Sequence, residues 1–262
     1  MIRDDDTMLF VTGTVHLLPS DIDWRSPAIN RAMSAADELV TELSPAELGR
    51  IGDIAPTYAK AVSATPAGDR FAPDLRDDFA DFAGDQNIAA DQMAAIDDWA
   101  IALTLAQASA RSAGLSADYG MDRALTATFA RAGKRQSGLE LATDQLGAFD
   151  AIPASEQRLM LNRLMRDIAD GRADDRLHEM IAAWSAGDLD ALAAIIARDA
   201  NLAPQANRIM LTDRNRKWSD WIIKRLERPG TTLVAVGAGH LAGPDSLIAI
   251  LAARGIAAQR LN

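Results

Sequence analysis

Two of the three histidines in this 262-residue chain occur in the same short pattern, one near each end. LFVTGTVHLLPSD spans residues 9 to 21, LVAVGAGHLAGPD spans residues 233 to 245, and in both a glycine precedes the histidine by three positions. Each pattern begins as a β-type run, and its glycine permits a tight turn and close approach to a ligand. A single histidine after a strand is commonly structural. The repeated context favours a shared site for His16 and His240.

Carboxylates at comparable positions add to these imidazoles. Glu42 ends the strand-like run at residues 38–42 (ELVTE), and Glu140 lies in a short β-like segment at residues 138–141 (GLEL). Imidazole and carboxylate suit manganese, cobalt or zinc, and an ion with an open position activates water. Without a metal, the same groups serve as a general base and its orienting carboxylate. Both alternatives point to hydrolysis, and HExxH is absent, so spacing alone does not choose between them.

Three further polar residues are candidates for the site. Arg214 and Asn215 fall in the first turn of an expected helix that ends near Glu227 and is capped by Thr212 or Asp213. An arginine there is able to hold a carboxylate or an oxyanion with two parallel hydrogen bonds. Asp122 follows a Tyr-Gly-Met turn, where it could also be an ordinary helix cap.

The elements around these residues predict an α/β fold with a mixed sheet. Residues 7–44 read as strand, turn, helix and strand, and residues 229–262 read the same way, with a last strand at residues 256–261. Residues 45–228 read as mostly helical. We therefore expect one domain over residues 1–262, with two pseudo-symmetric units forming its core and a large helical insertion between them.

Composition excludes several classes of function. A net charge of −10 disfavours binding to nucleic acid, and no apolar run is long enough for a membrane span. No nucleotide cofactor is expected, because the glycine pattern after residue 236 departs from the dinucleotide fingerprint and too few residues follow it. No export signal precedes the first strand, which indicates the cytoplasm, or the periplasm or exterior if a signal was removed. Oligomeric state is left open.

Five segments in order resemble the TraB/GumN family, which is related to the Tiki proteins and more distantly to the erythromycin esterases. They are GTVHLLP, ADELVTELSP, YGMDRALTATFARAGKRQSGLELATDQLGAFD, DRNRKWSDWI and VAVGAGHLAGPDSLIAILAARG. The paired GxxH motifs are the most specific part. This chain has Met121 where the family usually has leucine before the aspartate.

The resemblance implies a set of functional residues, of which His16, Glu42 and His240 are the expected ligands of a divalent ion. Glu140 is expected to assist as a ligand or base and Arg214 to stabilise an oxyanion, while Asn215 and Asp122 contact the substrate. The leading interpretation is a Tiki-like metal-dependent peptidase acting on a peptide or small molecule. The alternatives are a metal-independent esterase-like hydrolase that uses His16 and Glu42, and a non-catalytic regulator that binds a peptide or signal.

Overall fold

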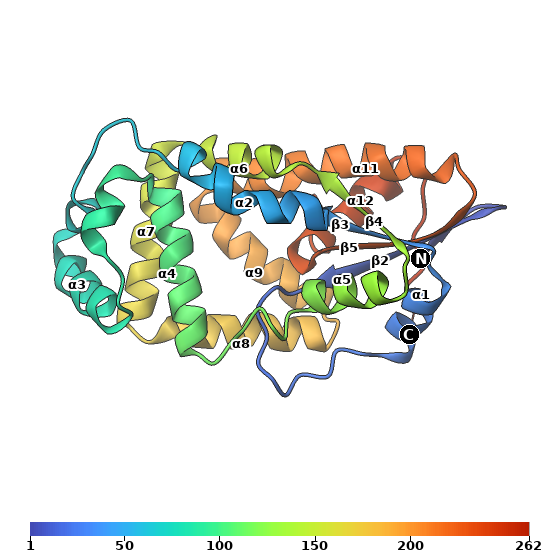
Figure 1. Cartoon of the computed structure of the whole chain (residues 1–262), viewed down its shortest axis with the longest axis horizontal. Helices are drawn as coiled ribbons and strands as arrows, with labels where there is room; N and C mark the ends of the chain where they lie inside the picture. The colour runs from blue at the N-terminus through green and yellow to red at the C-terminus, as the bar shows by residue number, and fades with distance from the viewer. Residues whose placement is uncertain (262) are drawn as a thin grey trace.

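Five strands form one mixed sheet at one end of the molecule, and helices form the other end (Figure 1). The structure is a computed structural model that describes residues 1–261. The strand order across the sheet is β1-β2-β5-β3-β4, and only β1 is antiparallel to its neighbour. The strands are β1 (Ile2–Arg3), β2 (Thr7–Thr14), β3 (Glu38–Leu43), β4 (Arg135–Glu140) and β5 (Gly230–Gly237). The predicted mixed α/β class is confirmed.

Most of the chain between β3 and β5 is helical, as predicted. The α-helices are α1 (Pro27–Ala35), α2 (Pro45–Tyr58), α3 (Arg76–Asp85), α4 (Asp98–Ser112), α5 (Met121–Arg131), α6 (Ala142–Asp150), α7 (Ala154–Ala169), α8 (Arg172–Ser185), α9 (Leu189–Leu202), α10 (Pro204–Asn207), α11 (Asp213–Leu226) and α12 (Leu247–Ala253). Shorter turns are the 3₁₀ helices η1 (Ala67–Arg70), η2 (Pro73–Leu75), η3 (Ala90–Ala95) and η5 (Ala238–Leu241) and the π-helix η4 (Arg208–Thr212). In residues 1–261 no helix is both long and apolar enough to cross a membrane.

The parallel register brings the carboxyl ends of four strands to the same edge of the sheet. Thr14 at the end of β2 is the partner of Gly237 at the end of β5, and Leu43 of β3 is the partner of Glu140 of β4. In open α/β sheets, ligands bind at this edge because the loops after the strands converge there.

The first predicted unit is present as β2, α1 and β3, but the second is incomplete. It consists of β5, η5 and α12, and residues 256–261 form no strand, so the prediction of a final strand there is wrong. β1 already pairs with the outer side of β2, and Gln259 instead exchanges backbone hydrogen bonds with Met1. The two pseudo-symmetric units are therefore not confirmed.

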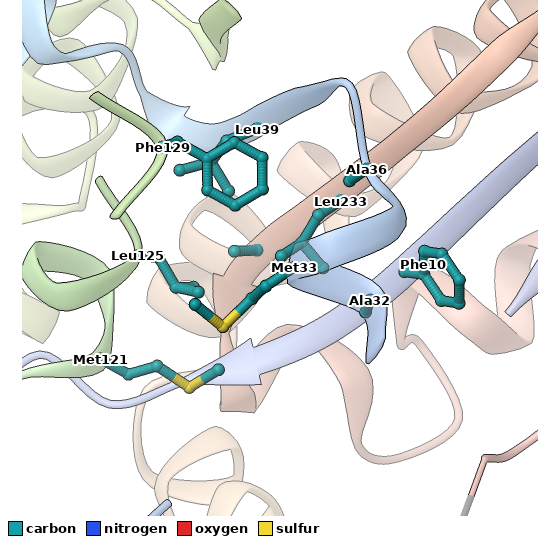
Figure 2. Packing of buried hydrophobic residues seen from close by; sticks show 10 residues of the cluster. Phe10, Ala32, Met33, Ala36, Leu39, Met121, Leu125, Phe129 and Leu233 are labelled. Atoms are coloured by element: carbon teal, nitrogen blue, oxygen red, sulfur yellow. The ribbon is translucent and has the colours of Figure 1, made fainter. Parts of the chain in front are cut away.

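Helices cover both faces of the sheet because successive side chains of β5 point to opposite faces. Leu233 belongs to a core with Phe10 of β2 and with residues of α1 and α5, including Met33 and Phe129 (Figure 2). Val234 belongs to the opposite core, which α11 and α12 close. The strands are therefore held between two packed layers, which makes their carboxyl ends a rigid support for a site.

Candidate functional site

His16 and Asp122 form a partly exposed pair beside the carboxyl ends of the strands. Asp122 accepts a hydrogen bond from Nδ1 of His16 through Oδ2 at 2.7 Å, and one from the Thr14 hydroxyl through Oδ1, also at 2.7 Å. With Nδ1–H bound to the carboxylate, Nε2 of neutral His16 is free to accept a proton. The His16 side chain is 66% exposed, so this pair is open to solvent.

Close backbone contact aligns Asp122 with His16. Asp122 lies in the first turn of α5, after Gly120, and the Met121 N–H donates to the Val15 carbonyl at 3.1 Å. A Cβ on Gly120 would lie 2.1 Å from the His16 carbonyl oxygen, so only glycine fits there. Asp122 was expected from the sequence as a substrate contact or a cap, and its observed partners are His16 and Thr14.

The hydrogen bond from His16 to Asp122 raises the pKa of His16 to about 9, and burial only partly opposes it. The charge of Glu42 also raises this pKa, whereas that of Arg214 lowers it, so both groups act on His16 electrostatically. His16 is therefore an imidazolium at neutral pH. Because the side chain is largely exposed, solvent screens part of its interaction with Asp122.

The Arg214 guanidinium lies at the centre of a buried cluster behind this pair, and all five of its N–H groups have acceptors. Nε and Nη2 donate to the two oxygens of Glu140 at 3.1 and 2.7 Å, and Nη2 also donates to Glu42 at 2.6 Å. Nη1 donates to the Met210 carbonyl at 3.0 Å and to Nε2 of His240 at 3.2 Å. An oxyanion can reach Arg214 only by replacing one of these acceptors.

The pKa values of the two carboxylates of the cluster are shifted in opposite directions. Burial raises the pKa of Glu140, and the hydrogen bond from Arg214 only partly offsets this effect. Burial also acts to raise the pKa of Glu42, but the charges of Arg214 and His240 and the Gly237 N–H lower it overall. The Gly237 N–H donates to Glu42 Oε1 at 2.8 Å, so the backbone adds to the stabilisation of the ionised form of Glu42.

His240 is buried and neutral in the same cluster. Its Nδ1–H donates to Asn215 Oδ1 at 2.7 Å, and its Nε2 accepts from Arg214, which defines the tautomer. Burial is the main cause that lowers the pKa of His240 to about 4. Asn215 is 1% exposed and donates through Nδ2 to the Asp245 carbonyl, so its side chain is fixed and orients His240.

The segment before Arg214 differs from the capped helix start expected at Thr212 or Asp213. Thr212 is already helical, and α10, the π-helix η4 and α11 follow one another without a break. A π-turn changes the backbone hydrogen-bonding partners locally. The Met210 carbonyl, inside this turn, accepts from the Arg214 side chain.

A family model described as the TraB/PrgY/gumN family matches residues 1–260. The chain belongs to this family. Membership in the TraB/PrgY/gumN family confirms the resemblance that the paired GxxH motifs indicated. Searches of curated proteins and of solved structures return no match.

The metal set that the TraB/PrgY/gumN resemblance implies does not fit the observed arrangement. The Arg214 cation lies between Glu42 and His240, and the Nε2 lone pair of His240 is directed at it. Within residues 1–261, no three or more histidine, cysteine or acidic side chains are grouped so as to hold an ion. Binding of manganese, cobalt or zinc by His16, Glu42 and His240 stays a prediction.

The sequence interpretation missed three residues of the site, all close to motifs of the family. Gln145 donates through Nε2 to Glu42 and to Glu140, at 3.3 Å each. Trp218 packs against the two basic groups, with its ring 4.3 Å from the His240 ring and 4.7 Å from Arg214 Cζ. Its spacing from Arg214, four positions along a helix, was a usable signal. The third is Thr14, inside the GTVH motif.

Proposed function

We propose that this chain is a hydrolase in which the His16–Asp122 pair transfers protons without a resident metal. The observation that carries the proposal is the 2.7 Å contact between Nδ1 and Asp122, which leaves Nε2 on an exposed imidazole. A carboxylate that fixes the tautomer in this way is the usual support for a histidine base. This is the metal-independent alternative, with Asp122 in the orienting position and Glu42 in the buried cluster.

The proposed reaction starts from the neutral form of His16, which predominates above a pH of about 9. Neutral His16 takes a proton from a water molecule at Nε2 while the water oxygen bonds to the carbonyl carbon of an ester or amide. The tetrahedral species then breaks its bond to the leaving group, which takes the proton back from Nε2–H. His16 is neutral again, and Asp122 stays ionised throughout.

The buried cluster supports this chemistry in two ways. Glu42 and Glu140 hold Arg214 and thereby give the floor of the site fixed charges. Preorganised charges stabilise a transition state without reorganising during the reaction. His240 keeps one tautomer between Arg214 and Asn215, so its orientation is also fixed.

Hydrolysis of a panel of chromogenic esters and peptides, measured after dialysis against a chelator, tests the proposal. We expect His16→Gln to lower kcat/KM by about 10²- to 10⁴-fold, the usual contribution of a general base. His178→Gln is the matched control, because His178 lies on α8, where its Nδ1 bonds to the Asp174 carbonyl of the same helix. Equal activity of the two variants would contradict the role of His16.

The pH profile gives a second readout of the same pair. The base acts when neutral, so kcat/KM should rise with pH up to about 9, the pKa of His16. In Asp122→Asn the hydrogen bond to a charged partner is lost, so the rise should move down toward the ordinary value of about 6.5. The same variant should be slower at its optimum by roughly 10²- to 10⁴-fold, because the tautomer is no longer fixed.

A Tiki-like metal-dependent peptidase is the second candidate, favoured by the convergence of Glu42, Glu140 and His240 on one cation. That cation is Arg214, so an ion requires the guanidinium to move. Activity that appears only after manganese, cobalt or zinc is added would select this candidate. A chain that hydrolyses none of the substrates in either condition would favour the non-catalytic regulator.

A further inference from the structure

A cavity of about 520 Å³ lies behind the two GxxH turns, away from His16 and the buried cluster. Gly13 of the first turn and Ala238 of the second both line it. These turns are in contact, since a Cβ on Gly13 would lie 3.0 Å from the Ala238 Cα. The volume is within the range of small-molecule sites. Figure 1 shows α1 close to the N-terminus, and Met1 and Gln259, which exchange backbone hydrogen bonds, also line the cavity.

Three aromatic side chains contribute to the cavity wall. Trp24, Trp184 and Phe10 line it, and Trp184 Nε1 donates to the Gly13 carbonyl at 2.9 Å. Neither tryptophan is fully buried, although both pack against hydrophobic core residues. Indole and phenyl walls favour a flat, apolar ligand body, because aromatic rings pack well by offset or edge contacts.

One cation in the wall has no acidic partner. The Arg25 guanidinium lies over the Trp24 ring, 4.8 Å from its centroid, and forms no ion pair within residues 1–261. The other charged side chains in the wall are Arg260, which donates to the Gly187 carbonyl, and Asp23. The wall therefore carries a net positive charge in a protein whose net charge is −10.

We propose that this cavity is a second binding site, separate from the hydrolytic one, for a small organic anion with a flat apolar body. The apolar body lies between the tryptophans, and the anionic group pairs with Arg25. The proposal is independent of the proposed hydrolase activity, because no residue of the proton-transfer pair or of the buried cluster lines the cavity.

Two dyes of similar shape and different charge test the site. The probes are 8-anilinonaphthalene-1-sulfonate, an anion, and N-phenyl-1-naphthylamine, its uncharged counterpart, titrated into the full chain with excitation of tryptophan. We expect saturable binding of the anion at one site, with energy transfer from tryptophan. Ala28→Phe, which fills the cavity from α1, should weaken the binding of both dyes by about tenfold or more.

Matched variants separate filling of the cavity from general damage. Ala35→Phe is the control for Ala28→Phe, because Ala35 is exposed on the same helix and does not line the cavity. If Ala28→Phe fails to fold, Ser185→Phe in α8 replaces it, with exposed Ala182→Phe as its control. Unchanged binding in the filled variant, or equal loss in its control, would overturn the site.

The charge requirement is tested independently. Arg25→Gln should weaken the binding of the anionic dye by roughly two- to fivefold, the effect of a partly exposed charge pair. The affinity for the uncharged dye should stay the same. Arg111→Gln, an exposed arginine of α4 outside the cavity, should change neither. Equal weakening of both dyes by Arg25→Gln would overturn the assignment of an anionic ligand.

Discussion

At neutral pH one histidine of the repeated pattern is charged and the other is neutral. The bond to Asp122 raises the pKa of His16 to about 9, whereas burial lowers that of His240 to about 4. Similar local sequences therefore place imidazoles of different protonation state beside the carboxyl ends of the strands. Local sequence does not carry this difference, because it depends on which side chains surround each ring.

His16 should make the stability of the protein fall as pH rises. Its folded pKa is above the unfolded value of about 6.5, so its contribution is complete below pH 6.5 and is lost toward pH 9. The side chain is largely exposed, so we expect a shallow slope. Urea unfolding should show that His16→Gln flattens this limb and that His178→Gln leaves it unchanged. A persisting slope in His16→Gln would assign the effect to another group.

His240 should make the stability of the protein fall as pH decreases. Its folded pKa of about 4 is below the unfolded value, so its contribution is present above pH 6.5 and is lost as pH falls toward 4. Carboxylates also titrate in this range. The test therefore compares the unfolding free energy of the wild type with that of His240→Gln, which should lose less stability between pH 6.5 and 4.

Arg214 should be far more important to folding than its neighbour Arg216. Replacing Arg214 by leucine leaves two buried carboxylates without their cation, and breaking a buried pair costs about 3–5 kcal/mol. Arg216 on the same helix is 63% exposed and pairs with Asp213, so Arg216→Leu should cost at most about 1 kcal/mol. Free energies of unfolding from urea titrations at pH 7 measure both. Similar losses would contradict the central place of Arg214.

At the level of elements, α5 and the turn after β2 position Asp122 and His16 for each other. Gly120 is the contact point, because a Cβ there would overlap the His16 carbonyl. The strands hold the buried cluster by register, since Leu43 and Glu140 are partners in β3 and β4. The residues of the His16–Asp122 pair and of the buried cluster therefore depend on neighbouring elements for their positions.

Gly120→Ala should separate the His16–Asp122 pair. The added methyl group requires α5 to shift from the turn, so we expect a loss of several kcal/mol, about 2–5, and a drop of the His16 pKa toward 6.5. Gly84→Ala is the control, because Gly84 lies in α3 with nothing near its Cβ position. There, alanine should stabilise the protein by about 0.4–1 kcal/mol. Unfolding titrations and the histidine NMR titration provide the readouts, and an unchanged His16 pKa in Gly120→Ala would refute this role.

At the level of the whole molecule, the site joins segments from both ends and from the middle of the chain. Glu42 and Arg214 are 172 positions apart, and Thr14 and Asp122 are 108 apart. Helices of the middle section also pack on one another, with α4 against α7 and α2 against α6 (Figure 1). An interruption in an exposed segment should therefore leave the two pieces associated.

Elastase should cut first in the segment between α2 and η1. Val62 is fully exposed, and residues 62–66 contain no helix or strand, so this backbone is accessible. We expect two fragments that elute together in size-exclusion chromatography and keep whatever activity the intact chain shows on the ester and peptide panel, because the site residues are outside the cut. Mass spectrometry locates the cut. A first cleavage within β5, or separation of the fragments, would contradict this account.

Much of the candidate site could be predicted because its residues follow regular elements. His16, Glu42 and Glu140 come at or after β-type runs, and parallel strands end at one edge. The prediction of a strand at residues 256–261 was wrong, because the apolar pattern there does not reveal that β1 already pairs with the outer side of β2. Gln145 was missed because an amide in a helix is common and nothing local marks its two carboxylate partners.

The sequence by itself determined the α/β class, the family, and the placement of two histidines and two glutamates at strand ends. These properties follow from hydrophobic periodicity and from short motifs, which are local. Only the tertiary structure decided that Asp122 binds His16 and that Arg214 binds Glu42, Glu140 and His240. Those partners are distant in the chain, and packing of the helices on the sheet determines which of them meet.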